Sequence, residues 1–374
     1  MLVTRLRLRD FRSYATADVQ LGEGLTVVHG RNGTGKTNLL EALYFGCTGR
    51  SCRTANEREL VRFGAGATRV EVSARDRDGG EHELSVGLQP GEPKHLRADG
   101  VAVDRLVDVV ARPLVSVFLP DRLGLVKGAP ALRRAHLDQV VAAVWPVRAA
   151  TRGAYARALA QRNALLARVR GGHASRSSLP AWDAELARHG VALRDDRAAV
   201  CELLLAPFAD HAAALGLAGE AALRFRPRSA ARDAEALAAE LHDRVEGDID
   251  RGFTGHGPHR DDLALVRDGR DLRAFGSQGE QRLALLSLLL AERDVLAHAR
   301  GAPPLLLLDD VMSELDGARR ARLAERVGAC GQAVVTTTDV GHVPGAGRPG
   351  VARVAVGDGR ALDTTPTPVP EAAA

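Results

Sequence analysis

One short stretch constrains this chain more than any other: residues 30–37 read GRNGTGKT and fit the phosphate-binding pattern GxxxxGK[ST]. An apolar run at 25–28 precedes the stretch and helix-forming residues follow it, so we expect a strand, a glycine loop and a helix. Backbone N–H groups of such a loop wrap phosphate oxygens, Lys36 adds a charge on the β- and γ-phosphates, and the Thr37 hydroxyl ligates Mg²⁺. The sequence therefore predicts a site for ATP with Mg²⁺; a glycine turn with an incidental lysine is the alternative.

The predicted nucleotide-binding residues of this loop are Gly30, Arg31, Asn32, Gly33, Thr34, Gly35, Lys36 and Thr37. We expect Lys36 to act also as a catalytic residue and Thr37 as a metal ligand.

A second motif lies near the other end of the chain, where the apolar run 305–308 ends in Asp309 and Asp310. An apolar run of this length is typical of a buried parallel strand, and two acids at its end match the Walker B arrangement. We expect Asp309 to hold Mg²⁺ and Asp310 to polarise the attacking water as a catalytic residue. A strand followed by an acidic helix cap would give the same letters.

Residues 277–282, SQGEQR, precede a long apolar segment at 278–300 that we expect to be a helix. They resemble the signature motif of ABC-type ATPases, in which Ser277 caps the helix and its amides suit an anion. In an ABC dimer this element contacts the γ-phosphate bound to the other subunit. Ser277 is therefore a predicted catalytic residue, with Gln278 and Gly279 as nucleotide-binding residues; by itself the motif is a common helix start.

Two further segments follow the acidic pair. Residues 313–316, SELD, match the D-loop that lines the same dimer interface in ABC-type proteins. Thr336, Thr337 and Thr338 stand where many ABC proteins have a switch histidine, and the nearest histidine is His342. This departure puts γ-phosphate sensing by a histidine in doubt.

Lys36 and Asp309 are 273 residues apart, far more than one nucleotide-binding fold needs, so something large is inserted. Ala/Leu/Arg-rich helical periodicity from 130 to 216 supplies the insertion. Short strands at 70–72, 82–86 and 114–118 should extend the sheet of the first lobe, and a helix is expected at 233–248. The predicted fold is α/β: an ABC-type P-loop ATPase head of two lobes with an inserted α-helical arm domain.

The predicted domains are ATPase head lobe I with the P-loop at 1–120, the inserted helical arm at 121–249, and lobe II at 250–363. Lobe II carries the signature, Walker B and D-loop segments. The tail at 364–374 carries three prolines and little to bury, so we expect it to be disordered.

Composition sets the cellular context. The chain is 45% hydrophobic and 26% charged, ordinary values for a globular protein. It has no signal-peptide core and no stretch of about 18 uninterrupted apolar residues, so we expect a cytoplasmic location and no membrane partner. Its four cysteines form no CxxC pair, which indicates buried or idle thiols.

Arginine is unusually dense from 130 to 176, where nine arginines accompany one acid, Asp138. Arg148 and Arg152 are four residues apart and share a helical face, so this stripe could neutralise DNA phosphates. An arginine-biased composition explains the same residues equally well. Aromatic residues are only 3% of the chain, so backbone-directed binding to duplex DNA is favoured over stacking on single strands.

Three more segments carry a specific resemblance: residues 49–54, GRSCRT; residues 125–130, LVKGAP, followed by Arg133-Arg134 and Leu137-Asp138; and residues 257–263, GPHRDDL. With the motifs above they stand in the order typical of the RecF family, and they span roughly residues 1–340. The chain thus resembles RecF proteins, ABC/SMC-like ATPases of bacterial DNA repair.

The resemblance implies a slow DNA-dependent ATPase that dimerises on ATP on double-stranded or gapped DNA. It implies work with RecR and RecO to load RecA at single-strand gaps, and roles in replication-fork maintenance and SOS induction. In related proteins the segment after the first strand, here residues 11–14, contacts the nucleotide base. His256 and His259 are expected in a loop packed on the ATPase lobe. The alternatives are the nucleotide-binding subunit of an ABC transporter and a short SMC-like structural tether.

Overall fold

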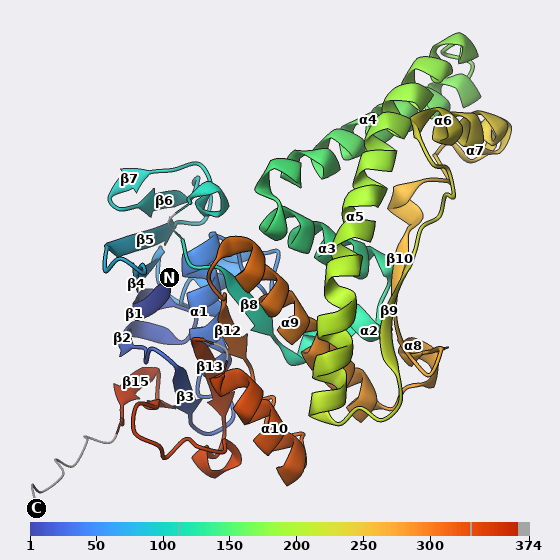
Figure 1. The fold of residues 1–374 in the computed structure, drawn as a ribbon. Helices are drawn as coiled ribbons and strands as arrows, with labels where there is room; N and C mark the ends of the chain where they lie inside the picture. Colours follow the sequence, from blue (N-terminus) through green and yellow to red (C-terminus); the bar gives the residue numbers. More distant parts are fainter. Residues whose placement is uncertain (111, 330, 366–374) are drawn as a thin grey trace, which may run out of the picture. The chain divides into compact units, whose positions relative to one another are not determined.

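The computed structural model describes residues 1–110, 112–329 and 331–365, which divide into two compact units (Figure 1). Unit 1 joins residues 1–121 to the chain from 300 onward, and unit 2 comprises residues 122–299. Residues 250–299 of the predicted lobe II therefore lie in unit 2, and the division into two lobes and an arm stays a prediction. Of the predicted disordered tail, 366–374 lie outside the described residues, whereas the Thr364 backbone N–H donates to Arg353 O at 2.8 Å.

Unit 1 contains two sheets. The strands of the first are β1 (Leu2–Phe11), β2 (Tyr14–Gln20), β4 (Thr68–Arg75), β5 (Glu81–Leu88), β6 (His95–Ala98) and β7 (Val101–Ala102), all antiparallel in the order β2-β1-β4-β5-β6-β7. Those of the second are β3 (Leu25–His29), β8 (Val115–Phe118), β12 (Leu305–Leu308), β13 (Ala333–Thr337), β14 (Ala352–Gly357) and β15 (Arg360–Asp363), in the order β15-β14-β3-β13-β12-β8. Its strands are parallel except β15.

The helices of unit 1 are α1 (Lys36–Thr48) and α10 (Gly317–Gly328), with 3-10 turns η1 (Glu57–Leu60), η2 (Leu106–Asp108), η3 (Pro120–Leu123) and η7 (Val340–His342). Helix α1 packs against strands of both sheets, because its apolar side chains, among them Leu39, Leu40 and Leu43, are fully buried. At Gly46 the helix touches β4 so closely that a Cβ would lie 2.4 Å from Val72 Cγ2. A glycine is therefore needed where helix and sheet meet.

The parallel sheet fixes the position of the site. All of β12 is buried between β13 and β8, which confirms the predicted buried parallel strand before Asp309. Strand β3 lies between β13 and β14, so residues 30–37 leave the carboxyl end of a central strand. Ligands of parallel α/β sheets bind at this edge.

One prediction about the sheets is wrong. The strands expected at 70–72, 82–86 and 114–118 do form, as parts of β4, β5 and β8, but they do not extend one sheet. β4 and β5 continue the antiparallel sheet from β1, whereas β8 pairs with β12 in the parallel sheet. Alternation within a strand identifies its buried face but carries no information about its partner.

Unit 2 is mainly helical. Its elements are α2 (Gly124–Lys127), α3 (Pro130–Val144), η4 (Pro146–Arg148), α4 (Ala149–Arg170), η5 (Arg176–Ser178), α5 (Leu179–Leu215), β9 (Ala221–Arg226), α6 (Ala234–Asp243), α7 (Val245–Arg251), η6 (Pro258–Arg260), β10 (Asp262–Arg267), β11 (Arg270–Asp271), α8 (Leu272–Phe275) and α9 (Gln278–Arg300). Helices α4 and α5 pack along each other, and an antiparallel sheet of β11, β10 and β9 runs beside α5 (Figure 1). The helix predicted at 233–248 is two helices, α6 and α7, which meet at Arg244.

Buried ion pairs connect the helices of unit 2. The fully buried Arg162 guanidinium binds Asp183 of α5 at 2.6 Å and Asp248 of α7 at 2.8 Å. A buried guanidinium is tolerated only with such paired acceptors, so these contacts fix how α4, α5 and α7 meet.

The predicted basic stripe on the helical segment is largely compensated by acids. Arg148 pairs with Asp196 at 3.0 Å, and Arg152 lies 3.4 Å from Asp138. These two guanidiniums therefore offer less free charge to DNA than their spacing in the sequence suggested.

One helical stretch among the described residues, Arg176–Leu215, is long and apolar enough by length and composition to cross a membrane. The core helix of a soluble protein meets the same criterion, so this is weak support for a membrane span. Helix α5 packs against α3, α4, α6 and β9, and 39% of its most apolar window is buried in the protein.

Candidate nucleotide-binding site

The loop between β3 and α1 has the backbone that a phosphate cradle requires. Gly30, Gly33 and Gly35 adopt φ values of 156°, 81° and 110°, in a region that favours glycine. A Cβ on Gly30 would lie 2.2 Å from Val356 O, whereas a Cβ on Gly33 would meet no protein atom within 4 Å. The first glycine is thus required by packing, and the second leaves open space over the loop.

Lys36 is the first residue of α1 and is only 7% exposed. Its Nζ donates to the carbonyl oxygens of Gly30 at 2.8 Å and Arg31 at 3.0 Å, so the ammonium lies over the loop. Burial lowers the pKa of Lys36, while the nearby Asp310 and Asp309 carboxylates oppose that shift. Arg31 and Asn32 are exposed at the tip of the loop, and Thr34 closes it by donating its hydroxyl to Arg31 O at 2.8 Å.

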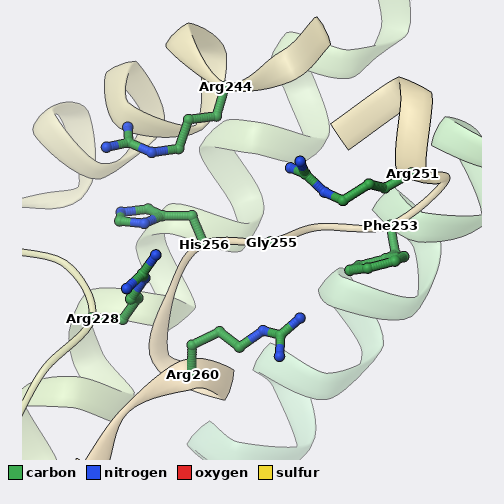
Figure 2. Close-up of a pocket in the computed structure, with 7 residues that line it drawn as sticks. All are labelled: Arg228, Arg244, Arg251, Phe253, Gly255, His256 and Arg260. Atoms are coloured by element: carbon green, nitrogen blue, oxygen red, sulfur yellow. The ribbon is translucent and has the colours of Figure 1, made fainter. Parts of the chain in front are cut away.

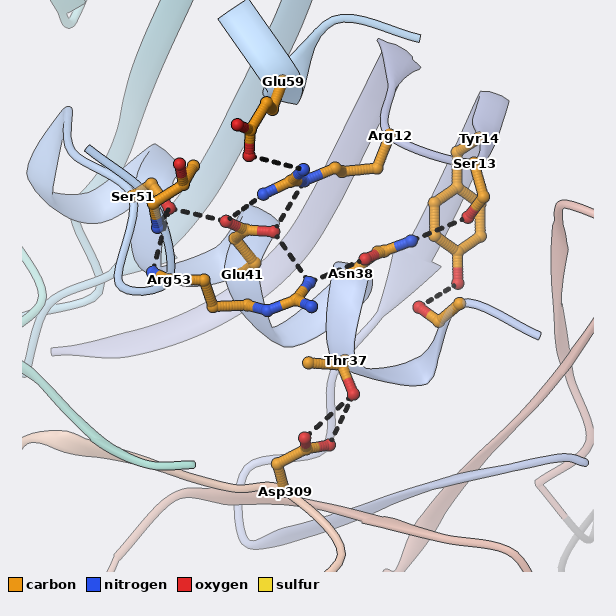
Figure 3. A network of polar contacts seen from close by, with 12 residues as sticks. Arg12, Ser13, Tyr14, Thr37, Asn38, Glu41, Ser51, Arg53, Glu59 and Asp309 are labelled. Carbon is orange, nitrogen blue, oxygen red and sulfur yellow. Dashed lines mark hydrogen bonds and ion pairs between the residues drawn. The ribbon is translucent and has the colours of Figure 1, made fainter. Parts of the chain in front are cut away.

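The P-loop helix and the acid-tipped strand are joined by a side-chain hydrogen bond. The Thr37 hydroxyl lies 2.8 Å from Asp309 Oδ2 and 3.1 Å from Oδ1 (Figure 3). The Thr336 hydroxyl donates to Asp309 Oδ1 at 2.7 Å from the neighbouring strand β13. Two hydroxyls, from Thr37 and Thr336, thus converge on one carboxylate.

Asp310 has an unusual backbone and an unsatisfied side chain. Its φ is 48°, in the left-handed region that few non-glycine residues adopt. The Asp310 backbone N–H donates to the Thr336 hydroxyl at 2.9 Å. Its buried Oδ1 has no hydrogen-bond partner among the described residues, so this oxygen is available to an added donor such as water.

These residues fit Mg²⁺ and a triphosphate. The Thr37 hydroxyl and the Asp309 carboxylate are hard oxygen ligands, the kind that Mg²⁺ takes together with substrate phosphates. The backbone amides at the start of α1 and the Lys36 ammonium supply positive charge beside them.

A polar network is centred on Glu41 of α1 (Figure 3). The Glu41 carboxylate is fully buried and accepts two hydrogen bonds from Arg12, both at 2.9 Å. It also accepts one from Arg53 at 3.2 Å and one from the Ser51 hydroxyl at 2.5 Å. The network ties the end of β1 and the loop after α1 to the nucleotide-binding helix.

The segment at 11–14 reaches the P-loop itself. Tyr14 donates its hydroxyl to Gly35 O at 3.0 Å, and the Asn38 amide donates to Ser13 Oγ at 3.0 Å (Figure 3). Phe11 and Tyr14 are fully buried, and burial raises the pKa of the Tyr14 phenol. These two aromatic rings are therefore core residues.

The predicted signature residues lie in unit 2, at the amino end of α9. The Ser277 hydroxyl accepts from Glu280 N at 3.3 Å, and Glu280 Oε2 accepts from Ser277 N at 2.8 Å, so the two residues form a capping box. Arg267 of β10 pairs with the same Glu280 carboxylate. Ser277, Gln278 and Gly279 are all exposed, so the amino end of α9 is accessible.

The D-loop segment packs next to the acids in unit 1. Ser313 donates its hydroxyl to Asp310 O at 2.9 Å, and Asp316 caps α10 through a hydrogen bond from Arg319 N at 2.9 Å. Glu314 is exposed.

The loop with the two histidines does not pack as expected. His259 accepts from the Tyr155 hydroxyl at 2.7 Å and donates from Nε2 to Thr254 O at 3.0 Å, so it packs on α4 within unit 2. His256 Nε2 lies 2.5 Å from Glu240 of α6. The prediction that this loop packs on the ATPase lobe is wrong. Contacts between a loop and neighbouring helices leave no periodic pattern in the loop sequence, so the sequence could not indicate them.

Sequence reasoning gave no role to two residues that the structure places at the site. Thr336 stood out only as the replacement for a histidine, and Glu41 was not singled out. A charged residue on the buried side of an amphipathic helix was the available signal for Glu41, since such a residue is buried only with partners.

Comparison with known proteins shows the family of this chain. The family described as "RecF/RecN/SMC N terminal domain" matches residues 2–354. The chain is 38% identical over 351 residues to the DNA replication and repair protein RecF of Acidothermus cellulolyticus, covering 90% of this chain and 94% of that protein. It is 40% identical over 350 residues to RecF of an Anaeromyxobacter species, covering 91% and 93%.

Solved structures give the same fold. The recombination mediator protein RecF with ATP, of the RecFOR pathway, superposes with a TM-score of 0.85 at 26% identity, covering 97% of this chain and 98% of that one. An SMC head bound to the C-terminal winged-helix domain of ScpA superposes at 0.61 with 18% identity, covering 98% of both chains, and supports the fold alone. The fold is therefore that of the RecF and SMC ATPase heads, as predicted.

Proposed function

Because this chain belongs to the RecF family, we propose that it is an ATP-dependent DNA-binding protein of recombinational repair. The proposed substrate is ATP with Mg²⁺, and the proposed reaction is slow, DNA-stimulated hydrolysis to ADP. The contact that carries the proposal is the one between the Thr37 hydroxyl and the Asp309 carboxylate. It brings the P-loop and the acidic strand, which are remote in sequence, into one site.

The residues of unit 1 divide the chemistry among them. The loop amides and Lys36 bind the β- and γ-phosphates, and Thr37 and Asp309 hold the metal. When bound there, Mg²⁺ would supply positive charge to the transferred phosphoryl group. Asp310 accepts a proton of the attacking water through its unsatisfied Oδ1, while Thr336 orients both acids.

The exposed amino end of α9 is the proposed contact to a second subunit. Ser277, with the amides of Gln278 and Gly279, would bind the γ-phosphate held by the P-loop of the partner. ATP would then join two chains, and hydrolysis would release them. The capping box at Ser277 supports this role because it holds the helix end in place without a ligand.

The DNA and protein partners follow from the family. We propose that the dimer closes on double-stranded or gapped DNA in the cytoplasm and acts with RecR and RecO to load RecA at single-strand gaps. Roles in replication-fork maintenance and SOS induction follow from the same action.

Light scattering with ATP and with ADP tests the switch. We expect a dimer with ATP and a monomer with ADP, and a monomer with both nucleotides would contradict the proposal. Gapped, duplex and single-stranded DNA should each be tested with and without ATP, using the wild type and Lys36→Arg. Equal DNA affinity in both states of the wild type would contradict the coupling of ATP to DNA.

Mixed variants test whether the site is shared between two chains. Lys36→Met should abolish nucleotide binding, and Ser277→Arg should block the partner contact, so neither variant alone forms a complete site. A mixture of the two should regain ATPase activity, because one of the two sites in a mixed dimer combines an intact P-loop with an intact Ser277. Failure of the mixture to recover any activity would contradict a shared site.

A further inference from the structure

Unit 2 contains a pocket of about 530 Å³ whose walls are dominated by arginine (Figure 2). It is lined by Arg228, Arg244, Arg251, Phe253, Gly255, His256 and Arg260. Arg244 and Arg251 come from the ends of α6 and α7, and Arg228 and Arg260 lie across the pocket from them (Figure 2). None of these residues belongs to the nucleotide site of unit 1.

The pocket carries uncompensated positive charge. Among the described residues, no acid pairs with the guanidinium of Arg228 or Arg260, and the Arg244 guanidinium donates to a backbone carbonyl, Glu240 O, at 2.7 Å. Arg251 pairs with Asp248 at 2.8 Å, but Asp248 also accepts from the buried Arg162. Four exposed guanidiniums around one cavity favour a bound anion, and their planar forks match phosphate oxygens.

An aromatic ring lies among these cations. Phe253 is 42% exposed, and the guanidinium carbons of Arg251 and Arg260 each lie 6.0 Å from its ring centroid. A half-exposed ring bordered by arginines is the combination that stacks an unpaired base while the adjacent phosphates are neutralised. An acidic peptide would use the guanidiniums and leave the ring without a partner.

The floor of the pocket is held in place by hydrogen bonds. His256 is buried, and its Nε2 lies 2.5 Å from Glu240, which also accepts from the Ser229 hydroxyl at 2.6 Å. The Gly255 backbone N–H donates to Asp248 at 3.0 Å. The loop that carries Phe253 is therefore anchored on both α6 and α7, so little ordering is needed for a ligand to bind.

We propose that this pocket binds a DNA strand at an unpaired nucleotide, with Arg228, Arg244 and Arg260 on the backbone phosphates and Phe253 stacked on the base. The inference rests on the proposed DNA-binding function and adds to it a place and a strand type. It also departs from the expectation that binding to duplex DNA is favoured over stacking on single strands.

Fluorescence anisotropy with a labelled oligothymidylate tests the pocket. Arg228→Ala with Arg260→Ala should weaken binding and flatten the salt dependence of log K by about 1.4, since each phosphate contact on a single strand contributes about 0.7. Phe253→Ala should weaken binding about 5- to 150-fold. All three side chains are substantially exposed, and thermal melts verify that the variants fold.

Two controls separate the pocket from general charge. Arg157→Ala with Arg168→Ala removes the same charge from exposed positions on α4 and should have a smaller effect. An abasic oligonucleotide keeps the phosphates and lacks the bases, so Phe253→Ala should leave its affinity unchanged. Equal losses in the two arginine double variants, or equal losses for both oligonucleotides in Phe253→Ala, would overturn the proposal.

Failure of this inference is distinguishable from failure of the proposed function. The pocket measurements need no nucleotide, whereas the proposed switch is read from the oligomeric state with ATP. If the wild type dimerises with ATP and the pocket-arginine variant binds DNA as tightly as the wild type does, only the pocket proposal is overturned. If the wild type stays monomeric with ATP and the pocket variants lose oligothymidylate binding, only the proposed ATP switch is overturned.

Discussion

The hydroxyl of Thr336 donates to Asp309 Oδ1 at 2.7 Å and accepts from the backbone N–H of Asp310 at 2.9 Å. One fully buried side chain thus holds both acids of the candidate site. Because Thr336 is not exposed to solvent, water cannot replace these two contacts. Thr336 is one of three threonines that stand where many ABC proteins have a switch histidine, and it contacts Asp309 and Asp310.

Replacing Thr336 with valine should lower the ATPase rate about 10- to 100-fold, the usual effect of losing a residue that orients metal ligands. The hydroxyl is lost at nearly constant volume, and the Asp310 N–H becomes an unsatisfied buried donor. Steady-state ATPase assays over a range of Mg²⁺ concentrations check this. Thr336→Ser should restore most of the rate; a serine variant as slow as the valine variant would contradict a role through the hydroxyl.

Asp310→Asn should reduce ATP hydrolysis about 10²- to 10⁴-fold while ATP still binds. The amide keeps the size of the side chain and tolerates the left-handed backbone at this position, where φ is 48°, but it cannot take a proton from water. Single-turnover hydrolysis and light scattering measure the two effects separately. We expect an ATP-bound dimer that persists; hydrolysis near the wild-type rate would assign the proton acceptor elsewhere.

Glu41→Ala should lower the free energy of unfolding by about 3 kcal/mol, because it leaves the Arg12 guanidinium without its buried partner. Urea denaturation measures the loss. Glu59→Ala is the matched control, since its half-exposed carboxylate lies 3.8 Å from the same arginine and should contribute less than about 1 kcal/mol. Similar losses in both variants would contradict a special role for the buried carboxylate.

His259 should make stability fall in mild acid. Burial lowers the pKa of His259 to about 4, whereas the unfolded chain keeps the ordinary value of 6.5. Below pH 6.5 the unfolded state binds a proton that the folded state does not, so stability present above that pH is lost as the pH falls toward 4. The loss is about 3 kcal/mol. Urea denaturation between pH 7 and 4 measures it, and His259→Gln should show a shallower decline.

The residues of the candidate nucleotide site were largely predictable because they lie in short contiguous motifs. The loop at 30–37 and the acids at 309–310 are each recognised from a short motif. Few other sequence patterns form a phosphate-binding loop or place a metal-binding acid at the end of a buried strand. Their meeting through Thr37 and Asp309 follows from parallel strands ending at one edge. The signature at Ser277 was predicted as a helix cap and forms one.

Other features depend on partners that no local pattern encodes. The pairing of β8 with β12 rather than with β5 joins residues far apart in sequence. Arg148 ends the turn η4 and Arg152 lies in α4, and acids from α5 and α3 compensate both. The arginine pocket likewise gathers residues from β9 to η6 that show no common spacing.

The order of strands in the parallel sheet has a consequence for synthesis on the ribosome. Strand β3, which leads into the phosphate-binding loop, is paired by β13 and β14, both in the last part of the chain. Gln332 likewise donates its side-chain amide to Val3 O at 2.6 Å and accepts from Val3 N at 2.9 Å. A nascent chain must therefore carry an unpaired, apolar β3 until all of unit 2 has been translated. During that interval it is exposed to chaperones, proteases and aggregation.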